Sequence, residues 1–167
     1  MKLTDYTDYS LRVMLYLALR GDELATIQEI SDAYGISKNH LMKVVQRLSE
    51  LGWVDTVRGR HGGLRLAANS LSLSVGEVVR QTETDLALVG CFRDERTERE
   101  CVIEPHCRLK HALVAARAAF FAELDRHTIG ELAQPPVELA GLLGLTPVVF
   151  MPLPEKHPAS RHPSREH

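Results

Sequence analysis

The chain has 167 residues, of which 44% are hydrophobic and 25% are charged, and its 20 Lys and Arg against 22 Asp and Glu give a formal net charge of -2. This length suits one core domain with an appendage rather than two large domains. No stretch approaches the roughly 18 apolar residues of a membrane span, and no signal-peptide core follows the charged start, so we expect a cytosolic protein. Spread evenly, this charge would argue against nucleic-acid binding, which requires clustered Lys and Arg.

The first predicted element is a helix whose apolar residues run from Leu11 to Leu19 at helical spacing. Either Asp5 or Thr7 is placed to cap its N-terminus, and Gly21 ends it. The element is apolar enough to belong to the core of the first domain.

A helix-turn-helix is predicted next. Thr26 and Glu29 form a capping box that opens a short helix, and Gly35 supplies the permissive turn residue after it. Ser37 then caps a second helix, whose core-facing residues are Leu41, Val44, Val45 and Leu48. Two short helices joined by a glycine-containing turn are typical of DNA-binding domains.

A small β wing follows these helices. Residues 53–57 read as a short strand, the sequence RGRHGG as a tight basic turn, and Leu64 and Leu66 as the returning strand. Ser74 and Glu77 are spaced as another capping box, before a helix that fades near Thr84. The sequence therefore predicts a mainly α fold with a small β wing, with a winged helix-turn-helix domain over residues 1–82.

The rest of the chain divides into four segments. Residues 83–104 form a charged loop with cysteines, and residues 105–128 form a long helix with Pro105 at its first position. The apolar residues of this helix step by four, three, four and four, and such a seam requires a partner: Leu109, Leu113, Ala116, Phe120 and Leu124. Residues 129–151 are a C-terminal segment, and residues 152–167 are expected to be a disordered tail.

The charge is not spread evenly. Between residues 38 and 65 there are six Lys and Arg and two acidic residues, which makes this the one basic stretch. In a helix-turn-helix the start of the second helix reads base edges in the major groove, and a wing meets phosphate or the minor groove. Taken alone, a single lysine is better explained as a solvated surface charge, but together these residues predict a DNA interface. The predicted contacts are Ser37, Lys38, Asn39, His40, Lys43, Arg58, Arg60, His61, Gly62 and Arg65.

The three cysteines, Cys91, Cys101 and Cys107, are spaced C-x9-C-x5-C. An odd number excludes a disulfide framework that uses them all. Without a Cys-x-x-Cys pair they fit an iron-sulfur cluster better than a zinc knuckle, and a fourth ligand is then missing. Buried free cysteines, a metal-free redox switch and a zinc-stabilised module stay open. Nearby candidates for the fourth ligand are Glu104, His106 and His111.

Three blocks of sequence resemble one family. These are MKLTDYTDYSLRVMLYLA at the start, ISKNHLMKVVQRLSELGWVDTVRGRHGGLRLA in the helix-turn-helix and wing, and CVIEPHCRLKHAL at the third cysteine. They are similar to the iron-sulfur winged-helix regulators that include NsrR and IscR, and the nitric-oxide-sensing NsrR branch is the more similar. The resemblance covers about residues 1–130. It implies a bacterial homodimer whose subunits pair through the long helix.

The resemblance also implies a ligand set. It makes Cys91, Cys101 and Cys107 the cluster ligands and Asp8, supplied by the other subunit, the fourth. Without a metal, Asp8 reads as a carboxylate stabilised by the positive end of a helix. IscR proteins use instead a histidine three positions after the last cysteine, where this chain has Lys110. The first cysteine gap is longer than usual in the family, but loop length adds little entropic cost, so a cluster remains feasible.

The resulting functional hypothesis is a repressor that binds a palindromic DNA site as a homodimer and releases it when nitric oxide reacts with the cluster. We expect a 4Fe-4S rather than a 2Fe-2S cluster. The alternative is a regulator of the same fold that senses iron-sulfur supply or redox state through a 2Fe-2S cluster or bare thiols. An enzyme is not expected, because neither a Cys-x-x-Cys pair nor a Cys and His in a cleft is evident.

Overall fold

The computed structural model describes residues 2–92, 101, 103, 106–134 and 136–145. The helices are α1 (Asp5–Arg20), α2 (Ile27–Tyr34), α3 (Lys38–Glu50), α4 (Val75–Thr82), α5 (Arg108–Leu124), α6 (Ile129–Leu132) and α7 (Pro136–Leu142). The strands are β1 (Val54–Val57) and β2 (Gly63–Leu66), and two 3-10 turns are η1 (Ser70–Ser72) and η2 (Gly90–Phe92). The predicted fold class, mainly α with a small β wing, is confirmed. The predicted tail, residues 152–167, lies outside the described residues.

Helix α1 is the centre of the winged-helix domain. Val13, Met14 and Leu17 are fully buried, and α1 packs against α3, α4, β2 and α6. The prediction that Asp5 or Thr7 caps this helix was wrong, because Thr4 takes that place and its hydroxyl accepts the N–H of Thr7 at 3.3 Å. The Thr7 hydroxyl is buried instead and donates to Thr82 Oγ1 at 2.9 Å, which ties α1 to α4.

The helix-turn-helix forms as predicted. Both halves of the Thr26 and Glu29 capping box are present, and Gly35 adopts the left-handed conformation with φ 65°, which favours glycine. Ser37 is the N-cap of α3, although its side chain makes no capping hydrogen bond. The four predicted core residues of α3, Leu41, Val44, Val45 and Leu48, are all buried.

The wing is an antiparallel hairpin in which Val54 pairs with Leu66 and Val57 with Gly63. Leu64 also exchanges two backbone hydrogen bonds with Ala25, of 2.9 and 2.7 Å, so the segment before α2 lies along the wing. This bridge fixes the hairpin against the helix-turn-helix.

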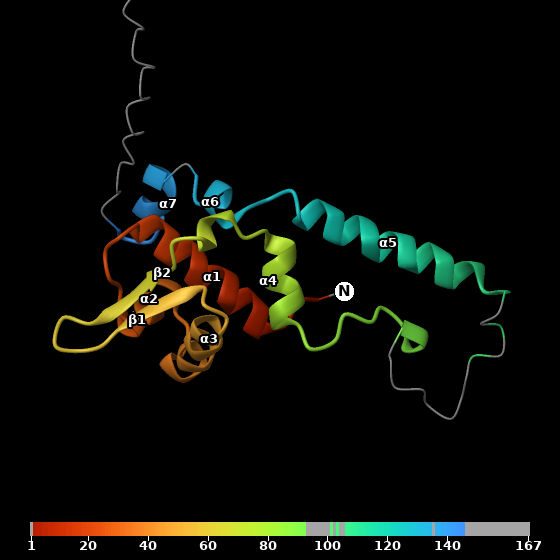
Figure 1. The fold of residues 1–167 in the computed structure, drawn as a ribbon, viewed down its shortest axis with the longest axis horizontal. Coiled ribbons are helices and arrows are strands. Elements are labelled where there is room, and N and C mark those ends of the chain that lie inside the picture. The colour runs from red at the N-terminus through yellow and green to blue at the C-terminus, as the bar shows by residue number, and fades with distance from the viewer. Residues whose placement is uncertain (1, 93–100, 102, 104–105, 135, 146–167) are drawn as a thin grey trace, which may run out of the picture.

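Helix α5 projects from the winged-helix domain and contacts α4 of that domain. Figure 1 shows its C-terminal end near α4 and α6, while its N-terminal end extends away from them. None of its residues is buried, and Leu109 of the predicted seam is 64% exposed. In contrast, α6 and α7 each bury one residue completely, Ile129 and Ala140. No helix in the described part of the chain combines the length and apolarity needed to cross a membrane.

Candidate DNA interface and cysteine site

The predicted contacts at the start of α3 share one exposed surface. Ser37, Lys38, Asn39, His40 and Lys43 are all exposed, while the opposite face of the helix is packed into the core. The 3.6-residue period thus separates the side chains that hold the helix from those available to a ligand. This is the arrangement that major-groove reading requires.

The first turns of α1 lie against this part of α3. The rings of Tyr9 and His40 stack with their centroids 6.1 Å apart and 27° between their planes. The Tyr6 hydroxyl donates to the Lys43 carbonyl oxygen at 3.5 Å. Asp8 lies between these two tyrosines in sequence. It therefore belongs to the part of α1 that contacts α3.

The wing carries the other predicted contacts. Arg58, Arg60 and His61 are exposed, but Arg65 pairs across the hairpin with Asp55, with Nε to Oδ2 3.3 Å. Gly62 has a folding role that the sequence did not reveal, because a Cβ there would overlap the Val57 carbonyl oxygen.

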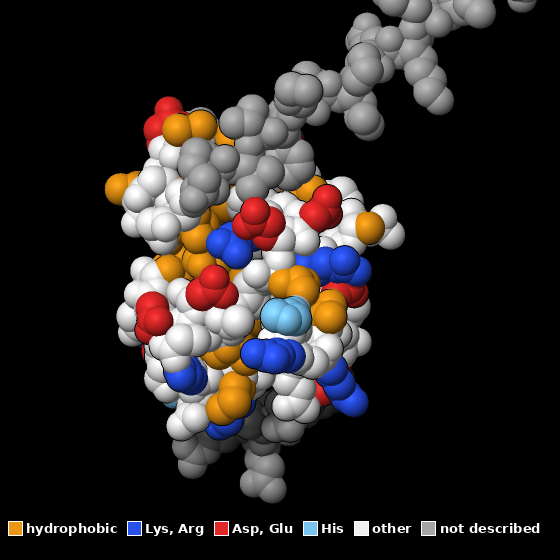
Figure 2. Space-filling view, turned by 90° about the vertical axis from the view of Figure 1, so that its left-hand side faces the viewer, with side chains coloured by type: hydrophobic (Ala, Val, Ile, Leu, Met, Phe, Trp, Pro, Cys, Tyr) orange, Lys and Arg blue, Asp and Glu red, His pale blue; other side chains and the backbone are white. Residues whose placement is uncertain are grey.

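Several cations of the basic stretch are left for a ligand. Arg47 pairs with Glu50, with Nη1 to Oε2 3.6 Å, in addition to the wing pair. Within the described residues, those without an ion pair are Lys38, Lys43, Arg58 and Arg60. Figure 2, which faces the side on which the wing lies, shows Lys and Arg side chains gathered over the lower part of that surface. The positive charge of this stretch is therefore not cancelled locally.

The cysteines lie on the far side of the chain from the wing. Cys91, in η2, and Cys101 are exposed, and Cys107 is partly buried. The helix predicted to start at Pro105 begins three residues later, at Arg108, and Cys107 is its N-cap. Its Sγ accepts the N–H of Lys110 at 3.3 Å, so this hydrogen bond orients the sulfur at the start of α5.

The single chain does not assemble a complete metal site from its described residues. No group of three or more His, Cys, Asp and Glu side chains is placed to hold a metal among them. His106 and His111 are exposed, and Glu104 and Pro105 lie outside the described residues, as does most of the loop between Cys91 and Cys101.

The carboxylate of Asp8 forms an ion pair with Arg12 on the same helix. Arg12 donates from Nε to Oδ1 at 3.0 Å, and its Nη2 lies 2.9 Å from Oδ2. The same guanidinium lies over the ring of Tyr34 on α2, 5.8 Å from its centroid. Burial raises the pKa of Tyr34 to about 12, against the lowering effect of Arg12.

In Figure 1, η2 is well separated from α1, so Asp8 and Cys91 of one chain do not meet.

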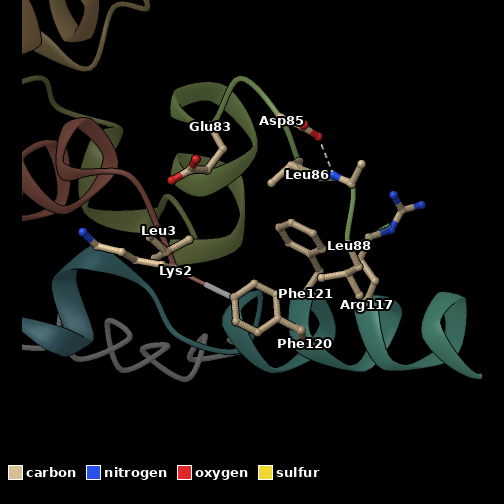
Figure 3. Close-up of a pocket in the computed structure, with 10 residues that line it drawn as sticks. Lys2, Leu3, Glu83, Asp85, Leu86, Leu88, Arg117, Phe120 and Phe121 are labelled. Atoms are coloured by element: carbon tan, nitrogen blue, oxygen red, sulfur yellow. Dashed lines mark hydrogen bonds between the residues drawn. The ribbon is translucent and has the colours of Figure 1, made fainter. Parts of the chain in front are cut away.

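A hollow of about 230 Å³ lies between the N-terminal segment, the chain after α4 and helix α5. Figure 3 shows Phe120 and Phe121 of α5 facing this space together with Leu3 and Leu86. Beside it the Thr4 backbone N–H and hydroxyl donate to Glu83 Oε1 at 2.7 and 3.1 Å. The start of α1 is thereby tied to the segment that leads to Cys91. Sequence reasoning missed this contact, since its partners are 79 residues apart.

A second long-range contact joins α4 to the end of α5. Arg80 donates through Nη1 and Nη2 to both carboxylate oxygens of Asp125, at 2.8 and 2.6 Å, and its guanidinium lies 4.5 Å from the Phe121 ring centroid. The Ser74 hydroxyl also donates to Asp125, at 3.3 Å. The hydrogen bond from Arg80 lowers the pKa of Asp125. Gly76 leaves the space for this carboxylate, because a Cβ there would overlap Asp125 Oδ1.

A family comparison gives these surfaces a context. The Rrf2 family, described as iron-dependent transcriptional regulators, matches residues 3–135 of the chain. The chain belongs to the Rrf2 family.

Relatives within the Rrf2 family are similar over nearly their whole length. A Bacillus subtilis protein named HTH-type transcriptional regulator NsrR is 49% identical over 144 residues, which are 86% of this chain and 97% of that protein. A protein of the same name from Halalkalibacterium halodurans is 45% identical over 148 residues, which are 88% of this chain and 100% of that protein. The resemblance inferred from the three sequence blocks is confirmed.

Solved structures show the same fold. CymR, the global cysteine regulator of Bacillus subtilis, gives a TM-score of 0.62 at 25% identity, over 80% of this chain and 96% of that one. IscR of T. potens gives a TM-score of 0.62 at 21% identity, over 83% and 90%, and shows the fold alone. As an Rrf2 protein the chain is a DNA-binding transcriptional regulator, and its relatives are regulators rather than enzymes.

Proposed function

We propose that the chain is a cytoplasmic bacterial repressor that binds palindromic promoter DNA as a homodimer and senses nitric oxide through an iron-sulfur cluster. The observation that carries the proposal is the 49% identity over 86% of the chain to a regulator named NsrR. The exposed polar start of α3, the exposed Arg58 and Arg60 of the wing and the three thiols support it.

The donor set suits such a cluster. Thiolates are the usual ligands of iron in these cofactors, and Cys91, Cys101 and Cys107 all fall in one short segment. The amide of Lys110 already donates to Cys107 Sγ, which orients a sulfur that would ligate the metal. We assign Asp8 of the partner subunit as the fourth ligand and a 4Fe-4S cluster as the cofactor. When bound, the cofactor supplies iron that reacts with nitric oxide.

The homodimer is proposed through α5. This helix has no buried residue in the single chain, and its predicted seam includes Leu109, which is 64% exposed. Two copies packed along the seam would remove this apolar surface from water. A two-fold dimer would then present two α3 helices to successive major grooves, about 34 Å apart.

Two short routes would couple Asp8 to the proposed DNA surface. Tyr6 and Tyr9, on either side of Asp8, contact Lys43 and His40 of α3. Arg12, which holds Asp8 in the single chain, also lies over Tyr34 at the end of α2. A change of partner at Asp8 would therefore shift the helix-turn-helix relative to α1. A switch follows only if the two arrangements differ in DNA affinity, and we assign the higher affinity to the loaded form.

The second candidate is a regulator of the same fold that senses iron-sulfur supply or redox state through a 2Fe-2S cluster or bare thiols. It is favoured by the exposure of Cys91 and Cys101, which leaves both thiols open to oxidants.

Anaerobic spectroscopy with nitric-oxide titration tests the proposal. The full-length protein, purified anaerobically from iron-replete cells, should contain iron and acid-labile sulfide and absorb in the visible range. Nitric oxide should change that spectrum and release promoter DNA in a gel-shift assay. Colourless protein without iron or sulfide excludes the cluster. An iron-to-sulfide ratio and spectrum typical of 2Fe-2S, or release by oxidant alone, supports the second candidate.

A further inference from the structure

We infer that Met42 sets part of the DNA sequence preference by packing its side chain against the 5-methyl group of a thymine in the major groove. This inference rests on the proposed placement of α3 in that groove. It assigns a contact to the apolar feature of the base edges, for which the polar side chains of α3 are less suited.

Met42 is a half-exposed apolar side chain on α3. The side chain is 50% exposed, although it belongs to a helix that buries four other apolar residues. Met42 lies three residues after Asn39 and four before Gln46, and residues at these spacings share one face of a helix. Both neighbours are exposed, so Met42 lies within the surface that would face DNA.

Packing within the protein covers only half of the Met42 side chain. The other exposed residues of α3 are polar: Lys38, Asn39, His40, Lys43, Gln46 and Glu50. Met42 itself lines a shallow, open hollow together with Ile27, Val45 and Thr56. Methionine is unbranched and has three rotatable bonds, which lets it adapt to an irregular apolar surface.

The 5-methyl group of thymine is an apolar partner that the major groove offers to Met42. Thymine presents a methyl group there, and it is the apolar feature among the base edges that α3 would meet. Asn39 is suited to a bidentate contact with adenine. Three residues along a helix advance about 4.5 Å, and successive base pairs are about 3.4 Å apart. Met42 would therefore meet a base next to or one beyond the one that Asn39 reads.

The test removes the methyl group alone. Palindromic duplexes that bind the full-length wild-type protein are selected from a random library, and each thymine of one half-site is then replaced by deoxyuridine. Wild type should lose about three- to fivefold in affinity at one thymine position, the value expected for one buried methyl group. Met42→Ala should bind the thymine duplex more weakly by a similar factor and should not respond to that replacement. Met42→Leu should retain most of the response.

The controls separate this contact from folding and from DNA binding itself. Met42→Ala should unfold at the wild-type temperature, because the side chain is half exposed. Leu71→Ala, which removes a 40% exposed apolar side chain on η1, should leave the response to deoxyuridine unchanged. A wild-type protein insensitive at every thymine, a selected half-site without thymine, or equal sensitivity in Met42→Ala overturns the inference while leaving the proposed function intact. Failure to enrich any duplex overturns both.

Discussion

Arg12, one turn after Asp8 on α1, contacts both oxygens of the Asp8 carboxylate. Its Nε lies 3.0 Å from Oδ1 and its Nη2 lies 2.9 Å from Oδ2. The Asp8 and Arg12 side chains are 46% and 43% exposed, so water screens the pair, which is worth about 0.3–0.5 kcal/mol on a helix surface. To act as a metal ligand, Asp8 must break its ion pair with Arg12. The free energy lost is small, because the pair is exposed to water.

This pair gives the first prediction. In metal-free protein, Asp8→Ala and Arg12→Gln should each lower the free energy of unfolding by about 0.5 kcal/mol or less, measured by urea denaturation. In anaerobically purified protein, Asp8→Ala should change the visible spectrum and the reaction with nitric oxide, because it removes a proposed metal ligand. Arg12→Gln should leave the visible spectrum unchanged.

Asp5→Ala is the matched control, since Asp5 also lies in the first turn of α1 and pairs only weakly with Lys2, with Nζ to Oδ1 3.6 Å. It should behave as wild type in both assays. If Asp8→Ala and Asp5→Ala give the same spectra and nitric-oxide reaction, Asp8 is a helix-terminus carboxylate and no ligand.

The second prediction concerns the contact between Gly76 and Asp125. Gly76→Ala should destabilise the protein by about 1 kcal/mol or less, because the added methyl group overlaps Asp125 Oδ1 and moves this exposed carboxylate away from Arg80. In an Asp125→Ala background the same substitution should be neutral or stabilise by up to about 1 kcal/mol, since alanine is the better helix former. Urea denaturation of the four proteins measures this change of sign. A cost of Gly76→Ala that is the same in both backgrounds contradicts the proposed overlap.

The sequence predicted the local parts of the fold well and the long-range parts poorly. The Thr26 and Glu29 capping box and the core face of α3 follow from spacing within a few residues, and both are present. Periodicity shows which face is buried, but not which distant side chain it meets. For that reason the contacts of Arg80 with Asp125 and of Thr4 with Glu83, 45 and 79 residues apart, were not foreseen. The proposed metal site would take one ligand from a second subunit, and spacing within one sequence does not show which residues of two chains meet.

The third prediction is a pH dependence from Asp125. Its pKa is lowered from the ordinary value of 3.8 by the hydrogen bond from Arg80, so this contact stabilises the fold fully above that value. The stabilisation is lost as the pH falls through the lowered pKa and the carboxylate becomes protonated. Asp125→Asn should therefore unfold at a lower temperature than wild type at pH 7, and the difference should shrink as the pH falls below about 4.

Thermal unfolding followed by circular dichroism measures this difference. Arg80→Gln should show the same convergence with wild type at low pH, because it removes the other partner. Glu123→Gln, which alters an exposed carboxylate on the same helix, should not. A difference between wild type and Asp125→Asn that stays constant from pH 7 to pH 3 rules out this origin.

The fourth prediction separates phosphate contacts from base contacts. Lys38→Ala, Lys43→Ala, Arg58→Ala and Arg60→Ala are expected to weaken promoter binding. Each cation that neutralises a phosphate should also reduce the slope of log affinity against log salt by about 1. Arg65→Ala should have a smaller effect on the slope, since Asp55 already pairs with that guanidinium at 3.3 Å.

Asn39→Ala should behave differently, because an amide that reads adenine carries no charge. It should cost about 1–3 kcal/mol on the preferred sequence, little on unrelated DNA, and nothing in the salt slope. Arg126→Ala, at a 76% exposed arginine beyond the end of α5, is the matched control and should bind as wild type. Fluorescence anisotropy over a salt series gives both quantities. If the α3 and wing variants share the wild-type slope while Arg126→Ala lowers it, the DNA surface lies on α5 and not on the winged-helix domain.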